Sequence, residues 1–244
     1  MIVKVFGCSL SGLDGLQVTV EVNVSRGAKF YMVGLPDNAI KESHQRITAA
    51  VKNIGMKIPI KEIIVNLAPA DIRKEGSAYD LTIAIAILTA TGLIPKNNII
   101  SDYLIMGELS LDGFLRPVKG VLSMAILAKR KGFKGIVVPL ENAAEASLVD
   151  EINVLPINHL TELIGHILGK KKINPLKENI DLNLTKRSLD FKDVKGQKSV
   201  KRALEIAAAG GHNILAMWVY HTYAIFFIYS TLQRYRKWHL KNIA

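Results

Sequence analysis

The sequence is poor in cysteine, with Cys8 as the only one in 244 residues. A single cysteine excludes a disulfide framework and a metal site built on paired cysteines, and it favours a reducing, cytoplasmic location. The six histidines lack HExxH or other paired-ligand spacing, so we expect neither a zinc site nor a metal cluster. The first residues alternate like a strand and lack the long apolar stretch of a secretory signal peptide.

Acidic residues are scarce in the second part of the chain, and none follows Glu205. Residues 1–165 carry 17 Lys and Arg against 16 Asp and Glu, whereas residues 166–244 carry 15 against 5. This asymmetry predicts that any DNA contact lies in the second part and is weak and electrostatic. A solvated, lysine-rich linker explains the pattern equally well. The candidate residues are Lys170, Lys171, Lys172, Lys186, Arg187, Lys192, Lys195, Lys198, Lys201 and Arg202.

Long apolar runs are also rare, and the most apolar one spans residues 214–229. Its 16 residues include His221 and fall short of the ~20 that cross a bilayer. We therefore expect no membrane contact, with a C-terminal membrane anchor as the alternative. Residues 218–244 hold eight of the 16 aromatic residues, and we interpret them as an aberrant tail produced by a disrupted reading frame.

Segments with strand and helix periodicity alternate through the first ~165 residues, which predicts an α/β (α+β) sandwich with helices covering a mixed sheet. The helix at 81–91 has almost no polar face, so we expect it to be buried, whereas His44 should be a solvated side chain. The predicted strands are 2–8, 16–24, 29–33, 62–67, 103–106, 136–138, 153–156 and 212–217, with a hairpin at 111–114. The predicted helices are 37–53, 81–91, 121–131, 141–148, 160–168 and 198–209.

Composition shifts divide the chain into four parts. We assign residues 1–168 to a first domain and residues 169–190 to a basic linker, because that segment is polar and has a helix-breaking proline. Residues 191–217 begin a second domain, and residues 218–244 form the tail.

Three strings in the first domain, residues 68–82, 106–120 and 132–142, resemble the Lon protease proteolytic domain, a Ser–Lys peptidase fold related to ribosomal protein S5 domain 2. Ungapped matching puts Ala78 at the Lon nucleophile and Leu122 at its lysine base, so the resemblance implies the fold without the catalytic dyad. The alternative is an active peptidase that uses Ser77 with Lys119, both displaced from the Lon positions. We expect Ser77 to be a helix cap instead.

A further string, residues 191–215, resembles the opening of the magnesium-chelatase-like AAA+ ATPase domain. A Lon-like domain followed by this opening is the layout of the ComM/YifB family. The resemblance implies that intact members are hexameric motors that use ATP and Mg²⁺ on DNA, with ComM associated with branch migration in natural transformation.

The family continues into a Walker A loop at a point where this sequence runs Ala216-Met217-Trp218. We therefore expect a chain truncated before that loop, which binds no cofactor and is not an enzyme by itself. Gly196 and Gln197 are vestigial candidates for the adenine side of a nucleotide site. The chain could still form a homo-oligomer.

Overall fold

The computed structural model describes residues 2–12, 14–176 and 196–210. The chain divides into two compact units, Met1–Asp181 and Leu182–Ala244. In the second unit the described residues contain α7 (Lys198–Gly210), which confirms the helix predicted at 198–209. The strand predicted at 212–217 and the tail at 218–244 lie outside the described residues.

The first unit is built on a seven-stranded sheet in the order β3-β4-β2-β1-β5-β8-β9. Its strands are β1 (Ile2–Ser11), β2 (Asp14–Ser25), β3 (Phe30–Val33), β4 (Glu62–Ala68), β5 (Tyr103–Ile105), β8 (Gly135–Pro139) and β9 (Asn153–Ile157). β2 runs antiparallel to β1 and β4, whereas the other four neighbouring pairs are parallel. The mixed sheet with helices packed on it confirms the predicted α/β class.

We call β3-β4-β2-β1, which contains both antiparallel pairs, the antiparallel part of the sheet, and most of it is buried on one face only. Val18, Val20 and Val22 of β2 are fully buried, and the residues between them are partly exposed. This alternation is expected where one face packs against the core and the other meets water. On the second face, which we call the open face, the partly or fully exposed residues include Ile2, Lys4, Glu21, Tyr31, Val33, Ile64 and Asn66.

The parallel part of the sheet has a different burial pattern. All five residues of β8 are buried, because helices pack around it. These helices are α4 (Val121–Arg130) and α5 (Ala143–Ala146), with α6 (Leu160–Ile167) against the neighbouring β9. A continuous apolar run is the pattern that a parallel strand covered on both faces requires.

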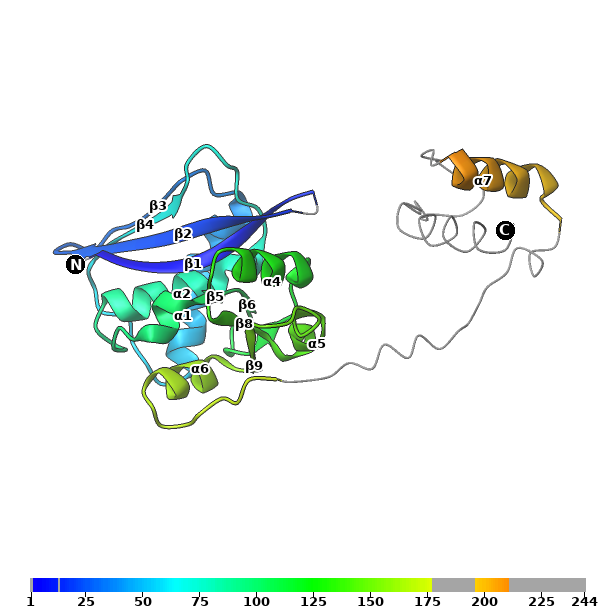
Figure 1. The fold of residues 1–244 in the computed structure, drawn as a ribbon. Coiled ribbons are helices and arrows are strands. Elements are labelled where there is room, and N and C mark those ends of the chain that lie inside the picture. Colours follow the sequence, from blue (N-terminus) through cyan, green and yellow to red (C-terminus); the bar gives the residue numbers. More distant parts are fainter. Residues whose placement is uncertain (1, 13, 177–195, 211–244) are drawn as a thin grey trace. The chain divides into compact units, whose positions relative to one another are not determined.

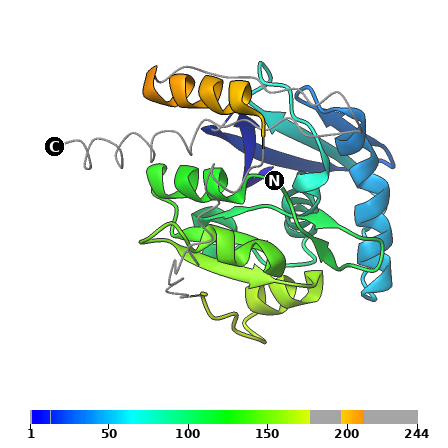
Figure 2. The ribbon, with the colours of Figure 1, turned by 90° about the vertical axis from the view of Figure 1, so that its right-hand side faces the viewer.

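Two helices cover the buried face of the antiparallel part, α1 (Asn38–Asn53) and α2 (Asp80–Ala90). Figure 1 shows both on the same side of β1 and β2, and Figure 2 shows these layers from a second direction. Asp37 caps α1 by accepting a hydrogen bond from the Ile40 amide at 2.8 Å, as its position before the helix predicts. All residues of α2 except the last are buried, which confirms the prediction for this segment.

Several local details differ from the sequence prediction. The helix α3 (Asn98–Asp102) was not predicted, and its cap Asn97 accepts hydrogen bonds from two amides of its first turn. The segment predicted as a helix at 141–148 is a 3-10 turn, η2 (Leu140–Asn142), followed by the short α5. The predicted hairpin is present as β6 (Glu108–Leu109) and β7 (Leu115–Arg116).

The start of the segment predicted as a linker packs on the first unit. The Leu176 amide donates to the Val154 carbonyl at 2.8 Å, so the chain continues beside the edge strand β9. Ile173 and Leu176 contact the hydrophobic core. The boundary between the two compact units falls later in that segment, after Asp181.

Candidate functional site

The region that corresponds to the Lon catalytic strings lies where three segments meet: the β3–α1 loop, the β4–η1 loop and the β6–β7 hairpin. The 3-10 turn η1 (Ser77–Tyr79) leads directly into α2. The first two loops are joined by backbone hydrogen bonds, from Asp37 to the Lys74 carbonyl at 3.1 Å and from Lys74 to the Leu35 carbonyl at 3.2 Å. The Gly76 amide donates to the second carboxylate oxygen of Asp37 at 2.8 Å. Asp37 therefore both caps α1 and fixes the residue that precedes η1.

Gly34 allows the β3–α1 loop to approach β4 closely. Its φ is 95°, and a Cβ atom at this position would lie 2.2 Å from the Leu67 carbonyl oxygen. Only glycine tolerates both the backbone conformation and this contact. The loop is thereby held in one arrangement at the edge of the site.

Lys74 is fully buried, which is unusual for a lysine in a loop. Its ammonium group donates to the Gly34 carbonyl at 3.1 Å and to the Pro69 carbonyl. Burial lowers the pKa of Lys74, and Asp71 opposes that shift. Lys74 therefore connects the two loops internally, and sequence reasoning missed it because loop lysines are usually solvated.

Ser77 and Ala78 occupy the place of the Lon nucleophile. The Ser77 hydroxyl donates to the Glu108 carboxylate on β6, and Arg116 on β7 lies 3.7 Å from the same carboxylate. The prediction that Ser77 caps a helix was wrong, because Gly76 holds the N-cap position and Glu108 accepts the hydroxyl hydrogen bond. The Ala78 carbonyl accepts a hydrogen bond from Gly107 at 2.8 Å, which fixes η1 against the hairpin.

The Ser77 hydroxyl is hydrogen-bonded to Glu108 and not to Lys119, the base of the alternative peptidase hypothesis. Leu122, at the lysine position, is 37% exposed on α4, and its amide donates to Glu145 at 2.9 Å. Lys119, the alternative base, is exposed. The methyl group of Ala78 cannot attack a carbonyl, and the isobutyl group of Leu122 cannot accept the proton of a nucleophile.

Next to Ser77, the buried carboxylate of Asp80 pairs with Arg46 of α1. The guanidinium group makes two hydrogen bonds to the carboxylate, at 2.7 and 2.9 Å, and the Leu109 amide donates to it at 3.2 Å. Burial raises the pKa of Asp80 and the Arg46 charge offsets part of that rise. The same pairing raises the pKa of Arg46. This pair joins α1, α2 and the hairpin, and sequence reasoning missed it because the partners are 34 residues apart.

The predicted basic residues are divided between the two units. Lys170, Lys171 and Lys172 are exposed at the end of α6, where Lys171 lies 4.0 Å from Glu162. Lys198, Lys201 and Arg202 share one face of α7 by their spacing, and Arg202 contacts Glu205 at 3.2 Å. Gly196 and Gln197 precede α7 with positive φ angles of 72° and 50°. The remaining four candidates, Lys186, Arg187, Lys192 and Lys195, lie outside the described residues.

Neither a metal centre nor a membrane span is found in the part of the chain that the structure describes. These residues contain no group of three or more His, Cys, Asp or Glu side chains placed to hold a metal ion. Within the same residues, no helix combines the length and the apolar character that crossing a membrane requires.

Two family models match the chain. The model described as subunit ChlI of Mg-chelatase matches residues 20–142, about half of the chain, and the model described as magnesium chelatase, subunit ChlI, matches residues 190–218. Lon protease 2 of Bacillus subtilis is 26% identical over 193 residues, covering 73% of this chain and 34% of that protein. The fold and these matches define a Lon-like domain joined to a magnesium-chelatase-related segment.

Two other relatives are more similar to this chain. The protein YifB of Salmonella typhimurium is 41% identical over 206 residues, which are 84% of this chain and 40% of YifB. Competence protein ComM of Haemophilus influenzae is 40% identical over 217 residues, or 86% of this chain and 42% of ComM. The chain belongs to the ComM/YifB family. It spans about 40% of the length of these relatives.

Proposed function

We propose that this chain is the N-terminal part of a ComM/YifB-type AAA+ ATPase whose intact members remodel DNA with energy from ATP, as hexamers in the cytoplasm. The observation that supports this proposal is the 40% identity to competence protein ComM, which extends over 86% of the chain. Branch migration during natural transformation is the specific reaction that we propose for the intact protein.

The Lon-like domain serves assembly or substrate engagement in this proposal and performs no hydrolysis. Ala78 and Leu122 stand at the positions where a Lon peptidase needs a hydroxyl and an amine. The polar side chains near η1, which contains Ala78, are engaged in contacts that hold loops and helices together, namely Asp37 with Gly76, Lys74 with Gly34, and Arg46 with Asp80. A rigid, catalytically silent surface suits a binding role.

ATP and Mg²⁺ belong to the intact protein in this proposal. Among the described residues, Gly196 and Gln197 form a left-handed turn before α7 that could contact an adenine. A phosphate site also needs a loop of backbone amides, a lysine and a Mg²⁺-binding hydroxyl, and the 244-residue sequence contains no Gly-x-x-x-x-Gly-Lys-Ser/Thr string. We therefore assign no nucleotide hydrolysis to this chain alone.

The test compares this chain with a full-length family member that is expressed and purified in the same way. The full-length protein should hydrolyse ATP faster when DNA is added, and the 244-residue chain should hydrolyse none under the same conditions. ATP hydrolysis by the purified chain, or a full-length protein indifferent to DNA in both ATPase and branch-migration assays, would contradict the proposal.

A Lon-type Ser–Lys peptidase is the second candidate, favoured by the similarity to Lon protease 2. Ser77 is its only available nucleophile at the matched turn, and its hydroxyl donates to the Glu108 carboxylate instead of an amine. Casein cleavage by the chain that disappears in Ser77→Ala, with Ser110→Ala as the matched control, would establish this candidate. We expect no cleavage by any of the three proteins.

A further inference from the structure

The first unit has a nearly balanced net charge, but four of its basic residues occur in two segments at one end of the sheet. No Asp or Glu occurs between Glu21 and Asp37, or between Glu42 and Glu62. The first of these stretches contains the β2–β3 turn and the second contains the α1–β4 loop. We call the exposed basic residues of these two segments, Arg26, Lys29, Lys57 and Lys61, the basic tip.

The two segments of the basic tip lie against each other. The Ile63 amide donates to the Lys29 carbonyl at 2.8 Å, and a Cβ atom on Gly27 would lie 2.9 Å from Glu62. Lys57 is four residues from Lys61, so their Cα atoms are at most about 14 Å apart. The backbone contacts therefore bring Arg26 and Lys29 close to Lys61, and chain connectivity keeps Lys57 near Lys61.

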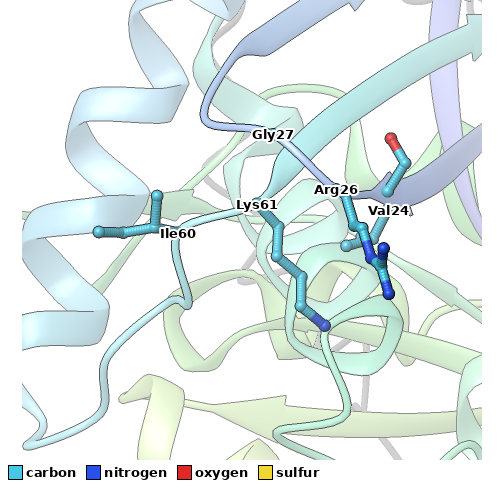
Figure 3. Close-up of a pocket in the computed structure, with 6 residues that line it drawn as sticks. Val24, Arg26, Gly27, Ile60 and Lys61 are labelled. Carbon is cyan, nitrogen blue, oxygen red and sulfur yellow. The ribbon is translucent and has the colours of Figure 1, made fainter.

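An open depression of about 410 Å³ lies between these segments, lined by Val24, Ser25, Arg26, Gly27, Ile60 and Lys61. Figure 3 shows the Arg26 and Lys61 side chains extending in the same direction, while Ile60 points away from them. The nearby carboxylate of Glu62 accepts a hydrogen bond from Ser25 at 3.0 Å. Among the described residues, none of the four cations of the basic tip forms an ion pair.

Unpaired cations that share a small surface repel one another, and a polyanion relieves that repulsion. Lys and Arg side chains neutralise phosphates of a nucleic-acid backbone and release the counterions bound there. Phosphate contacts position a nucleic acid without reading its sequence. An open depression with two flanking cations suits an extended backbone better than an enclosed small molecule.

We propose that the basic tip of the Lon-like domain is a contact surface for the phosphate backbone of DNA. The choice of DNA rests on the proposed function, whereas the position of the surface rests on the geometry. The basic tip lies within residues 1–165, whose nearly equal numbers of basic and acidic residues led us to expect any DNA contact in the second part of the chain.

The test measures binding of the full 244-residue chain to a fluorescent duplex of about 30 base pairs by anisotropy, between about 50 and 200 mM KCl. In the tip variant, Arg26, Lys29, Lys57 and Lys61 are changed to Gln. In the control variant, the exposed Lys41, Lys96, Lys119 and Lys131 are changed to Gln, which removes the same charge elsewhere. The tip variant should bind the duplex at least about tenfold more weakly. The slope of log K for DNA binding against log salt concentration should become less steep by up to about 3 to 4.

Three results would overturn the inference: no DNA binding by the unaltered chain at the lowest salt concentration, equal losses in the tip and control variants, or a loss confined to a variant with Lys170, Lys171 and Lys172 changed to Gln. Circular dichroism of each variant checks that it is folded. The proposed function fails separately, if the full-length protein shows neither DNA-stimulated ATP hydrolysis nor branch migration while the tip still binds DNA.

Discussion

The two parts of the sheet differ in how they meet their surroundings. In the antiparallel part, Tyr31 and Val33 of the edge strand are 43% and 46% exposed, and the open face is only partly covered. In the parallel part, Ile136, Val137 and Val138 are completely buried between helices. Burial on both faces leaves the parallel strands little freedom to change, because each side chain must fit its neighbours. The basic tip lies at the antiparallel part.

The helix layer over the antiparallel part depends on the buried pair of Asp80 and Arg46. Asp80→Asn removes the negative charge that balances Arg46 and should lower the free energy of unfolding by about 4 kcal/mol. Urea unfolding followed by circular dichroism measures the change. Glu42→Gln is the matched control, because Glu42 contacts the same guanidinium group at 3.9 Å but is well exposed.

The control Glu42→Gln should lower the free energy of unfolding by less than about 1 kcal/mol, because exposed ion pairs contribute little to stability. Equal effects of the two substitutions would show that the buried pair is not what joins α1 to α2.

A second experiment compares the two parts of the sheet directly. Ile136→Ala in β8 creates a cavity in a fully buried strand and should cost about 3 kcal/mol. Ile64→Ala in β4 removes a partly exposed side chain from the open face and should cost about 1 kcal/mol. Thermal and urea unfolding of both variants measure the difference. If Ile64→Ala proves as costly as Ile136→Ala, something covers the open face in solution.

The smallest expected effect concerns how the edge strand β3 is attached. His44 of α1 stacks on Phe30 of β3 with ring centroids 3.9 Å apart, and burial lowers the pKa of His44. Because the folded state binds this proton less readily than the unfolded state, the stabilising contribution is complete above the unfolded pKa of about 6.5 and is lost as pH falls through the folded pKa.

His44→Phe keeps an aromatic ring on Phe30 and removes the titration. Urea unfolding at about pH 8 and about pH 5 should therefore show a smaller loss of stability on acidification in the variant than in the unaltered chain. An identical loss in both proteins would mean that other groups account for the acid sensitivity.

Much of the fold was predictable from local signals. Asp37 followed by an amphipathic segment predicted α1, and the continuous apolar segment before Thr91 predicted the buried α2. The five-residue α3 was missed because it is too short for a periodic signal, although its Asn97 cap was a usable clue. Helices predicted from the spacing of apolar residues along the chain are therefore confirmed where they are long enough to show that spacing.

The polar contacts of the candidate site were not predictable in the same way. Ser77 looked like a helix cap and His44 like a solvated residue, and both predictions were wrong because their partners, Glu108 and Phe30, come from other elements. Lys74 is buried through carbonyl groups that lie five and 40 residues away in sequence. The Lon-like positions Ala78 and Leu122 came from matching the sequence to a family, and their part in function stays a prediction.

Charge counts along the sequence had a similar weakness. Averaging over residues 1–165 hid the basic tip, because its cations come from two segments, 26–29 and 57–61, that meet only in the folded domain. The candidates Lys170, Lys171 and Lys172 were visible because they are consecutive. The DNA-binding roles of both groups remain to be measured.

The burial of Cys8 has a practical consequence for every binding measurement described above. Its thiol is 1% exposed and donates to the Ser9 carbonyl at 3.2 Å, and burial raises its pKa to about 11. At neutral pH almost none of the Cys8 side chain is in the reactive thiolate form, so maleimide reagents should not label Cys8. A cysteine introduced on the surface would then carry a fluorophore or spin label at one defined position, without any need to replace the native residue.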